Sequence, residues 1–176
     1  MENRKSNQAR LTTGLFIVYL LLLTWIILFK MQFSFDRLPQ FRGLNFIPFA
    51  GSVIKNDRLD YSEIILNLIA FIPFGLYLSM LKLNWPFWKK LIPIAGASLL
   101  FELLQFLFAI GGTDITDFLS NTLGGITGIG LYIGLSRIFK ERTNRILNIL
   151  ALIGTISIVL LGVLAMSFMT YSFPDR

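Results

Sequence analysis

The sequence predicts an all-α protein, a polytopic transmembrane helical bundle of about five helices. Of its 176 residues 55% are hydrophobic, and the mean hydropathy is +0.68. The apolar residues form repeated runs of about 20 residues, which is the length that crosses the hydrocarbon core of a bilayer. The sequence has neither Cys nor His, which excludes disulfides, thiol chemistry, Ser-His triads and ordinary zinc sites.

The apolar runs place the helices in order along the chain. A basic N-terminus at 1–10 precedes the first helix at 11–29, whose apolar run is longer than that of a signal peptide. The other helices are expected at about 61–81, 91–110, 115–136 and 146–169, and a polar C-terminal tail follows at 170–176.

The segment 30–60 is the long polar loop, and its mixture of charges and Phe suits a segment lying on a membrane surface. A simple tethered connector is the alternative. The N-terminus and the 82–90 and 137–145 loops carry more Lys and Arg than the 30–60 loop and the C-terminus. By the positive-inside rule the N-terminus is cytoplasmic, and the 30–60 loop and the C-terminus are extracellular. The net charge is +6, and the basic residues flank the apolar runs. We therefore interpret them as signals that orient the helices in the membrane and as contacts to anionic lipid, not as a nucleic-acid-binding surface.

Polar side chains interrupt the apolar runs of three helices. With this topology and a rise of 1.5 Å per residue, all of them lie within roughly 12 Å of the outer surface. Ionisable groups at membrane depth are costly and are functional candidates. The set comprises Asn67 in the second helix, Glu102 and Gln105 in the third, and Asp114, Asp117 and Asn121 at the start of the fourth.

Glu102 and Asp117 are the candidate catalytic residues, because two nearby carboxylates in a low dielectric cannot both ionise cheaply. Such a pair could exchange a proton or hold a cation. The sequence has no metal-ligand spacing motif, and we expect neither a metal site nor a cofactor. Two other roles stay open: amide side chains can bridge helices, and Asp114 can cap the fourth helix. The candidate binding residues are Asn67, Gln105, Asp114 and Asn121.

Glycines continue the polar stripe of the fourth helix. Gly124 and Gly128 share a face with Asp117 and Asn121 and form a small-xxx-small pair. A second pair, Gly130 and Gly134, follows. Small residues at this spacing let helix backbones approach closely, so we expect the fourth helix to pack tightly against a neighbour. The same pairs would permit oligomers, and the sequence leaves the oligomeric state open.

The chain resembles the VanZ family of small membrane proteins. The similar segments are LNFIPF (44–49), NLIAFIPFG (67–75), FELLQF (101–106) and TDITDFLSNTLGG (113–125), with WIILFK (25–30) before them. They define a VanZ-like domain at 11–136, and the fifth helix is similar only in being apolar. The resemblance implies a bacterial plasma membrane protein that lowers susceptibility to the lipoglycopeptide antibiotic teicoplanin, with little or no effect on vancomycin.

Three functions are compatible with these features. The leading hypothesis is a non-enzymatic protein that binds the antibiotic or its lipid-linked peptidoglycan precursor at the outer leaflet and keeps the two apart. The alternative is an intramembrane enzyme that modifies a lipid or lipid-linked cell-envelope precursor, with Glu102 or Asp117 as general acid or base. A proton-coupled carrier ranks last, because five helices without an internal repeat do not suit one. Membrane lipids are the expected general partners.

Overall fold

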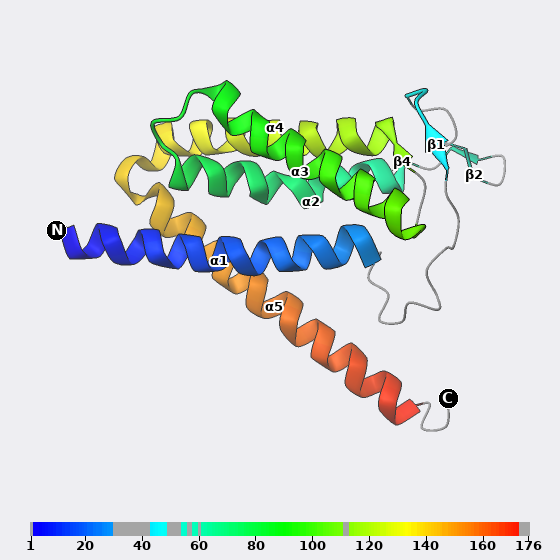
Figure 1. Ribbon diagram of the computed structural model, residues 1–176. Helices are drawn as coiled ribbons and strands as arrows, with labels where there is room; N and C mark the ends of the chain where they lie inside the picture. Colours follow the sequence, from blue (N-terminus) through cyan, green and yellow to red (C-terminus); the bar gives the residue numbers. More distant parts are fainter. Residues whose placement is uncertain are drawn as a thin grey trace.

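The computed structural model describes residues 2–29, 43–48, 54–55, 58–59, 61–110 and 113–172. The helices are α1 (Glu2–Phe29), α2 (Ser62–Leu81), α3 (Phe87–Phe108), α4 (Ile115–Phe139) and α5 (Thr143–Ser172), with a 3₁₀ turn η2 (Lys140–Arg142). The short strands are β1 (Leu44–Asn45), β2 (Ile54–Lys55), β3 (Arg58–Leu59) and β4 (Thr113–Asp114). Figure 1 shows α1 to α4 side by side, with α5 leaving the bundle at an angle.

The described residues contain four stretches long and apolar enough to cross a membrane, and the last of them includes two helices. α1, α2 and α3 each hold one stretch of spanning length and composition, and a fourth stretch, Ile115–Leu164, covers 50 residues. Since about 20 residues cross a bilayer, 50 residues exceed a single crossing. The stretch is broken at η2, where Lys140 has a φ of 48° and the chain turns back (Figure 1). The prediction of an all-α bundle of five helices is therefore confirmed.

Two helices are longer than predicted, because they continue into the polar N-terminal and C-terminal segments. α1 begins at Glu2, nine residues before the apolar run, because Glu, Arg, Lys, Gln and Ala are all good helix formers. α5 continues to Ser172, so the expected tail at 170–176 is helical over its first part. Residues 173–176 lie outside the described chain, as do most of the residues of the 30–60 loop.

α3 is bounded by two backbone signals. It begins at Phe87, earlier than expected, directly after Pro86, whose φ of −64° suits the residue that precedes a helix. It ends at Phe108 because Ala109 adopts the left-handed conformation, with a φ of 55°. That sharp end directs the chain into β4, which pairs in parallel with β1. The pairing brings a part of the long loop to the start of α4.

α2 and α4 run parallel and have the closest contact in the bundle (Figure 1). Glycines on α4 make this approach possible. A Cβ atom on Gly124 would collide with the carbonyl group of Leu68, and one on Gly128 would collide with that of Ile72. The two backbones therefore touch without intervening side chains, which is the geometry that small residues permit in membrane helices.

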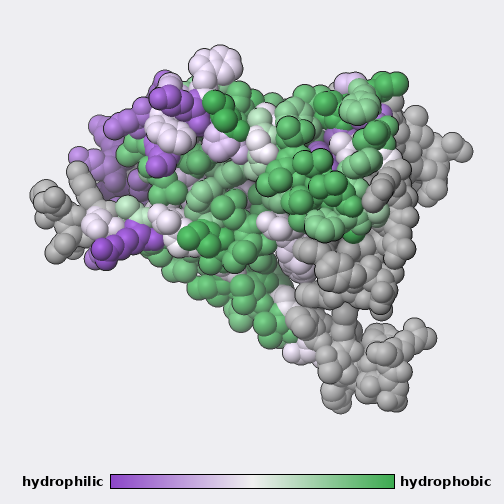
Figure 2. All heavy atoms as spheres, in the orientation of Figure 1, coloured by the Kyte–Doolittle hydropathy of each residue, from purple (hydrophilic) through white to green (hydrophobic). Residues whose placement is uncertain are grey.

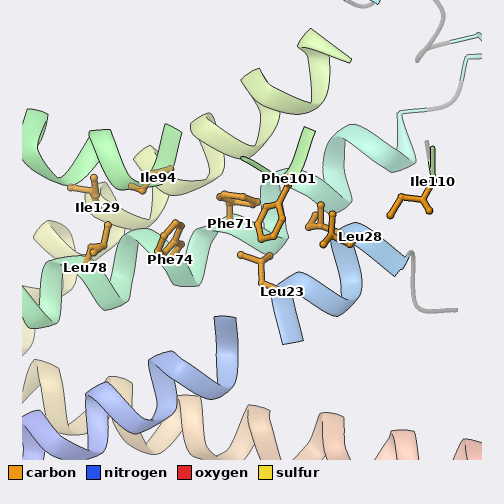
Figure 3. Packing of buried hydrophobic residues seen from close by; sticks show 10 residues of the cluster. Leu23, Leu28, Phe71, Phe74, Leu78, Ile94, Phe101, Ile110 and Ile129 are labelled. Atoms are coloured by element: carbon orange, nitrogen blue, oxygen red, sulfur yellow. The ribbon is translucent and has the colours of Figure 1, made fainter. Parts of the chain in front are cut away.

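The main hydrophobic core lies between α1, α2, α3 and α4 (Figure 3). Phe71 is fully buried, and its ring packs edge-on against Phe101 with 6.2 Å between the ring centroids. The Tyr19 hydroxyl of α1 donates a 2.7 Å hydrogen bond to the Ala70 carbonyl of α2. The core members are Leu23, Ile27, Leu28, Phe71, Phe74, Leu78, Ile94, Phe101, Ile110 and Ile129.

Polar and charged residues gather at one end of the bundle. The start of α1, the α2–α3 turn and the α4–α5 turn lie at the same end, at the left in Figure 1, and this end is hydrophilic in Figure 2. Lys82, Lys89, Arg137 and Arg142 are exposed there. The positive-inside rule predicts that this end is cytoplasmic. The opposite end carries β1, β4 and the start of α4 (Figure 1).

Candidate functional site

A cavity of about 480 Å³ lies at the strand-bearing end of the bundle, between α1, α2, α3 and α4. It brings together polar residues that are far apart in the sequence, and their roles remain predictions. Five of the six polar candidates line this cavity: Asn67, Glu102, Gln105, Asp117 and Asn121. Its other lining residues are Ile26, Ile27, Ser62, Glu63, Leu66, Ile69 and Ala70.

Glu102 is the most completely buried carboxylate of the cavity, with 2% of its surface exposed. Its Oε2 atom accepts a 2.9 Å hydrogen bond from the backbone N–H of Asp114. Its backbone carbonyl accepts a 3.1 Å hydrogen bond from the Thr113 hydroxyl. Glu102 thus joins the end of α3 to the start of α4, and its carboxyl group is held in a fixed position at the cavity wall.

Asp114 is not one of the residues that line the cavity, and it caps α4. Its Oδ1 atom accepts a 2.8 Å hydrogen bond from the N–H of Thr116, as an N-cap residue does. Its Oδ2 atom accepts a 3.1 Å hydrogen bond from Nδ2 of Asn45. The structure therefore gives Asp114 the capping role that the sequence left open. It also makes Asp114 the link between β1 and Glu102.

Asn121 lines the cavity and holds a buried hydrogen-bond acceptor. The side chain is 1% exposed, and its Nδ2 atom donates a 3.1 Å hydrogen bond to the hydroxyl of Ser98. Within the described part of the chain, no group donates to its Oδ1 atom. A buried acceptor without a donor costs about 1–3 kcal/mol. A ligand that donates an N–H or O–H group there would recover part of that free energy.

Gln105 bridges two helices. Its Nε2 atom donates a 3.0 Å hydrogen bond to the carbonyl of Ile27 near the end of α1, and the side chain is 4% exposed. Contacts of this kind in membranes contribute about 0.6 kcal/mol on average. Asn67 and Asp117 are half-buried and line the cavity from α2 and α4.

Sequence reasoning missed two polar residues of the cavity, Ser62 and Glu63. Glu63 lies four residues before Asn67 and shares its helix face, so the sequence did contain a signal for it. With Glu63, three carboxyl groups line the cavity. They are not grouped as a metal site: the described residues contain no cluster of three His, Cys, Asp or Glu that could hold a metal ion.

Comparison with known proteins identifies the family. A model of the VanZ/LLP1 family matches residues 16–140. The chain is also 39% identical over 154 residues to Protein VanZ of Enterococcus faecium, covering 86% of this chain and 90% of that protein. No solved structure matches this chain. The match includes α2, α3 and α4, the helices that carry the polar residues of the cavity. The protein belongs to the VanZ/LLP1 family and is a bacterial membrane protein.

Proposed function

We propose that this protein lowers susceptibility to teicoplanin by holding part of the antibiotic, or part of its lipid-linked peptidoglycan precursor, in the cavity between α1, α2, α3 and α4. The observation that carries the proposal is the convergence of five polar side chains from three helices on one cavity of about 480 Å³. The similarity to Protein VanZ supports the antibiotic class. Binding would keep the antibiotic and its target apart.

The composition of the cavity wall suits an amphiphilic ligand. Amide and carboxyl groups supply donors and acceptors, whereas Ile26, Leu66 and Ile69 supply apolar surface. Mostly apolar pockets with a few fixed polar groups are typical of small-molecule sites. Glu102 is held in place by its hydrogen bond to the Asp114 N–H, so little reorganisation is needed when a ligand binds.

The proposed orientation places the cavity near the outer leaflet. The positively charged end of the bundle faces the cytoplasm under the positive-inside rule, and the cavity lies at the other end. Teicoplanin carries an acyl chain that vancomycin lacks. An acyl chain inserted in the outer leaflet would hold teicoplanin at the same depth as the cavity. Vancomycin has no such chain, so the proposal explains a selective effect on teicoplanin.

Direct binding tests the proposal. In lipid nanodiscs, the wild-type protein is expected to bind teicoplanin or the lipid-linked precursor saturably and vancomycin weakly or not at all. Asn121→Leu removes the acceptor at the cavity wall and is expected to weaken binding about tenfold, the equivalent of about 1.4 kcal/mol. Titration followed by calorimetry measures both.

Asn148→Leu is the matched control for this experiment. Asn148 is a buried amide, 2% exposed, and its Oδ1 atom accepts a 3.0 Å hydrogen bond from Thr12 in the α1–α5 contact, outside the cavity. Its replacement removes an equally buried amide and should leave binding unchanged. The absence of saturable binding by the wild-type protein to either ligand would rule the proposal out.

The alternative function is an intramembrane enzyme acting on a lipid or lipid-linked precursor. The observation in its favour is that Glu102 and Asp117 line the same cavity, where one carboxyl group could donate a proton and the other accept one. Lipid profiles of cells with and without the protein separate the two functions. A new lipid species that disappears in Glu102→Gln supports the enzyme.

A further inference from the structure

The strand β1 and the two residues after it form a segment with a polar face and an apolar face, here named the strap (residues 44–47). The polar face points at the start of α4. β1 pairs with β4 in parallel, the N–H of Thr113 donates a 2.8 Å hydrogen bond to the carbonyl of Gly43, and Asn45 donates to Asp114. The Asn45 Oδ1 atom also accepts a hydrogen bond from the N–H of Ile47, which fixes the turn after the strand.

The other face of the strap is apolar and exposed. Leu44 and Phe46 flank Asn45 in the sequence, and Leu44 points to the opposite side of β1 from Asn45 because side chains alternate along a strand. Their exposed fractions are 57% and 70%, and that of Ile47 is 68%. Three large apolar side chains so exposed within four residues would be unfavourable in water, since burying such a side chain fully is worth about 1.5–3 kcal/mol.

The position of the strap relative to the candidate membrane spans indicates what covers its apolar side chains. At the end of α3, which leads directly into β4, Leu107 and Phe108 are 57% and 66% exposed and belong to a candidate membrane span. Because β1 pairs with β4, which lies between the candidate spans α3 and α4, the strap lies at the level where α3 ends and α4 begins. In Figure 2 hydrophobic side chains reach the upper right, where Figure 1 places β1.

We propose that the strap is an interfacial anchor: Leu44, Phe46 and Ile47 insert into the boundary between head groups and acyl chains of the adjacent leaflet, while Asn45 fixes the strap to the start of α4. Apolar residues in such surface elements reach about 5–10 Å into this boundary. The hydrogen bonds from Asn45 to Asp114 and from Asp114 to Glu102 connect this lipid contact to the cavity.

Spin labelling tests the anchor on the full chain in liposomes. Because the sequence has no Cys, a single introduced cysteine carries the only label. Labels on Phe46→Cys and Ile47→Cys are expected to be more accessible to oxygen, which concentrates in lipid, than to a water-soluble nickel chelate. Leu107→Cys is the lipid-facing reference, and Asn84→Cys, in the exposed α2–α3 turn, is the aqueous reference.

The labelling experiment contains no antibiotic, so its result does not depend on whether the proposed function is correct. Accessibility at 46 and 47 that matches the label at 107 supports the anchor, and accessibility that matches the label at 84 overturns it. Adding Asn45→Ala to Phe46→Cys is expected to sharpen the spectrum of the label, because the strap loses its side-chain link to Asp114. An unchanged spectrum would overturn the role of Asn45 in fixing the strap to the start of α4.

Discussion

Replacing Gly128 with Ala is expected to destabilise the bundle by about 1–3 kcal/mol, and replacing it with Leu is expected to abolish folding. The reason is that the added Cβ would meet the backbone carbonyl of Ile72. A backbone group cannot rotate away as a side chain can, so α2 and α4 must separate. That contact supports the cavity, since Asn67 on α2 and Asn121 on α4 line its wall. Thermal unfolding in detergent, followed by the loss of monodisperse protein, measures the change.

Gly130→Ala provides the internal control on the same helix. Gly130 has no described atom within 4 Å of the added Cβ, and Ala is the better helix former. The midpoint of unfolding should therefore be unchanged or slightly raised. Equal loss of stability in the variants at 128 and 130 would show that the close α2–α4 contact is not what the glycines provide.

Glu102→Ala is expected to lower both stability and function. It removes the acceptor for the N–H of Asp114, and a buried donor left without a partner costs about 1–3 kcal/mol. Glu102→Gln keeps an acceptor and removes the ionisable carboxyl group, so its loss of stability should be smaller, about 1 kcal/mol. Comparing the unfolding midpoints of the two variants separates the structural role of Glu102 from its chemical role. Equal stability of the wild-type protein and Glu102→Ala would contradict the role of Glu102 in joining α3 to α4.

The helices and the convergence of polar residues could be predicted because they follow from local rules. Apolar runs of fixed length give the spans, and a fixed rise per residue gives the depths. These two rules alone bring Asn67, Glu102 and Asn121 to one level of the bundle, where the structure has a cavity. Glu63 was missed because a charge at the start of a helix is ordinary at a membrane edge, although its spacing from Asn67 was informative.

The pairing of the strap with the start of α4 could not be predicted because it depends on contacts between distant residues. Asn45 and Asp114 are 69 positions apart, and a strand of two residues has no periodicity to detect. The role of each glycine pair also depends on contacts between distant residues. Gly124 and Gly128 meet α2, whereas Gly130 and Gly134 have no described atom within 4 Å of an added Cβ. Spacing alone does not distinguish a pair that faces a helix from one that does not.

The most direct test of the proposed site is drug susceptibility in a sensitive Gram-positive host. Wild type, Glu102→Gln, Asp117→Asn and the control Asn148→Leu would be expressed at equal membrane levels and tested against teicoplanin and vancomycin in parallel. The proposal predicts protection against teicoplanin by the wild type and the control, loss of protection in both carboxylate variants, and little effect on vancomycin. Full protection by Glu102→Gln and Asp117→Asn would contradict a working role for the cavity carboxylates.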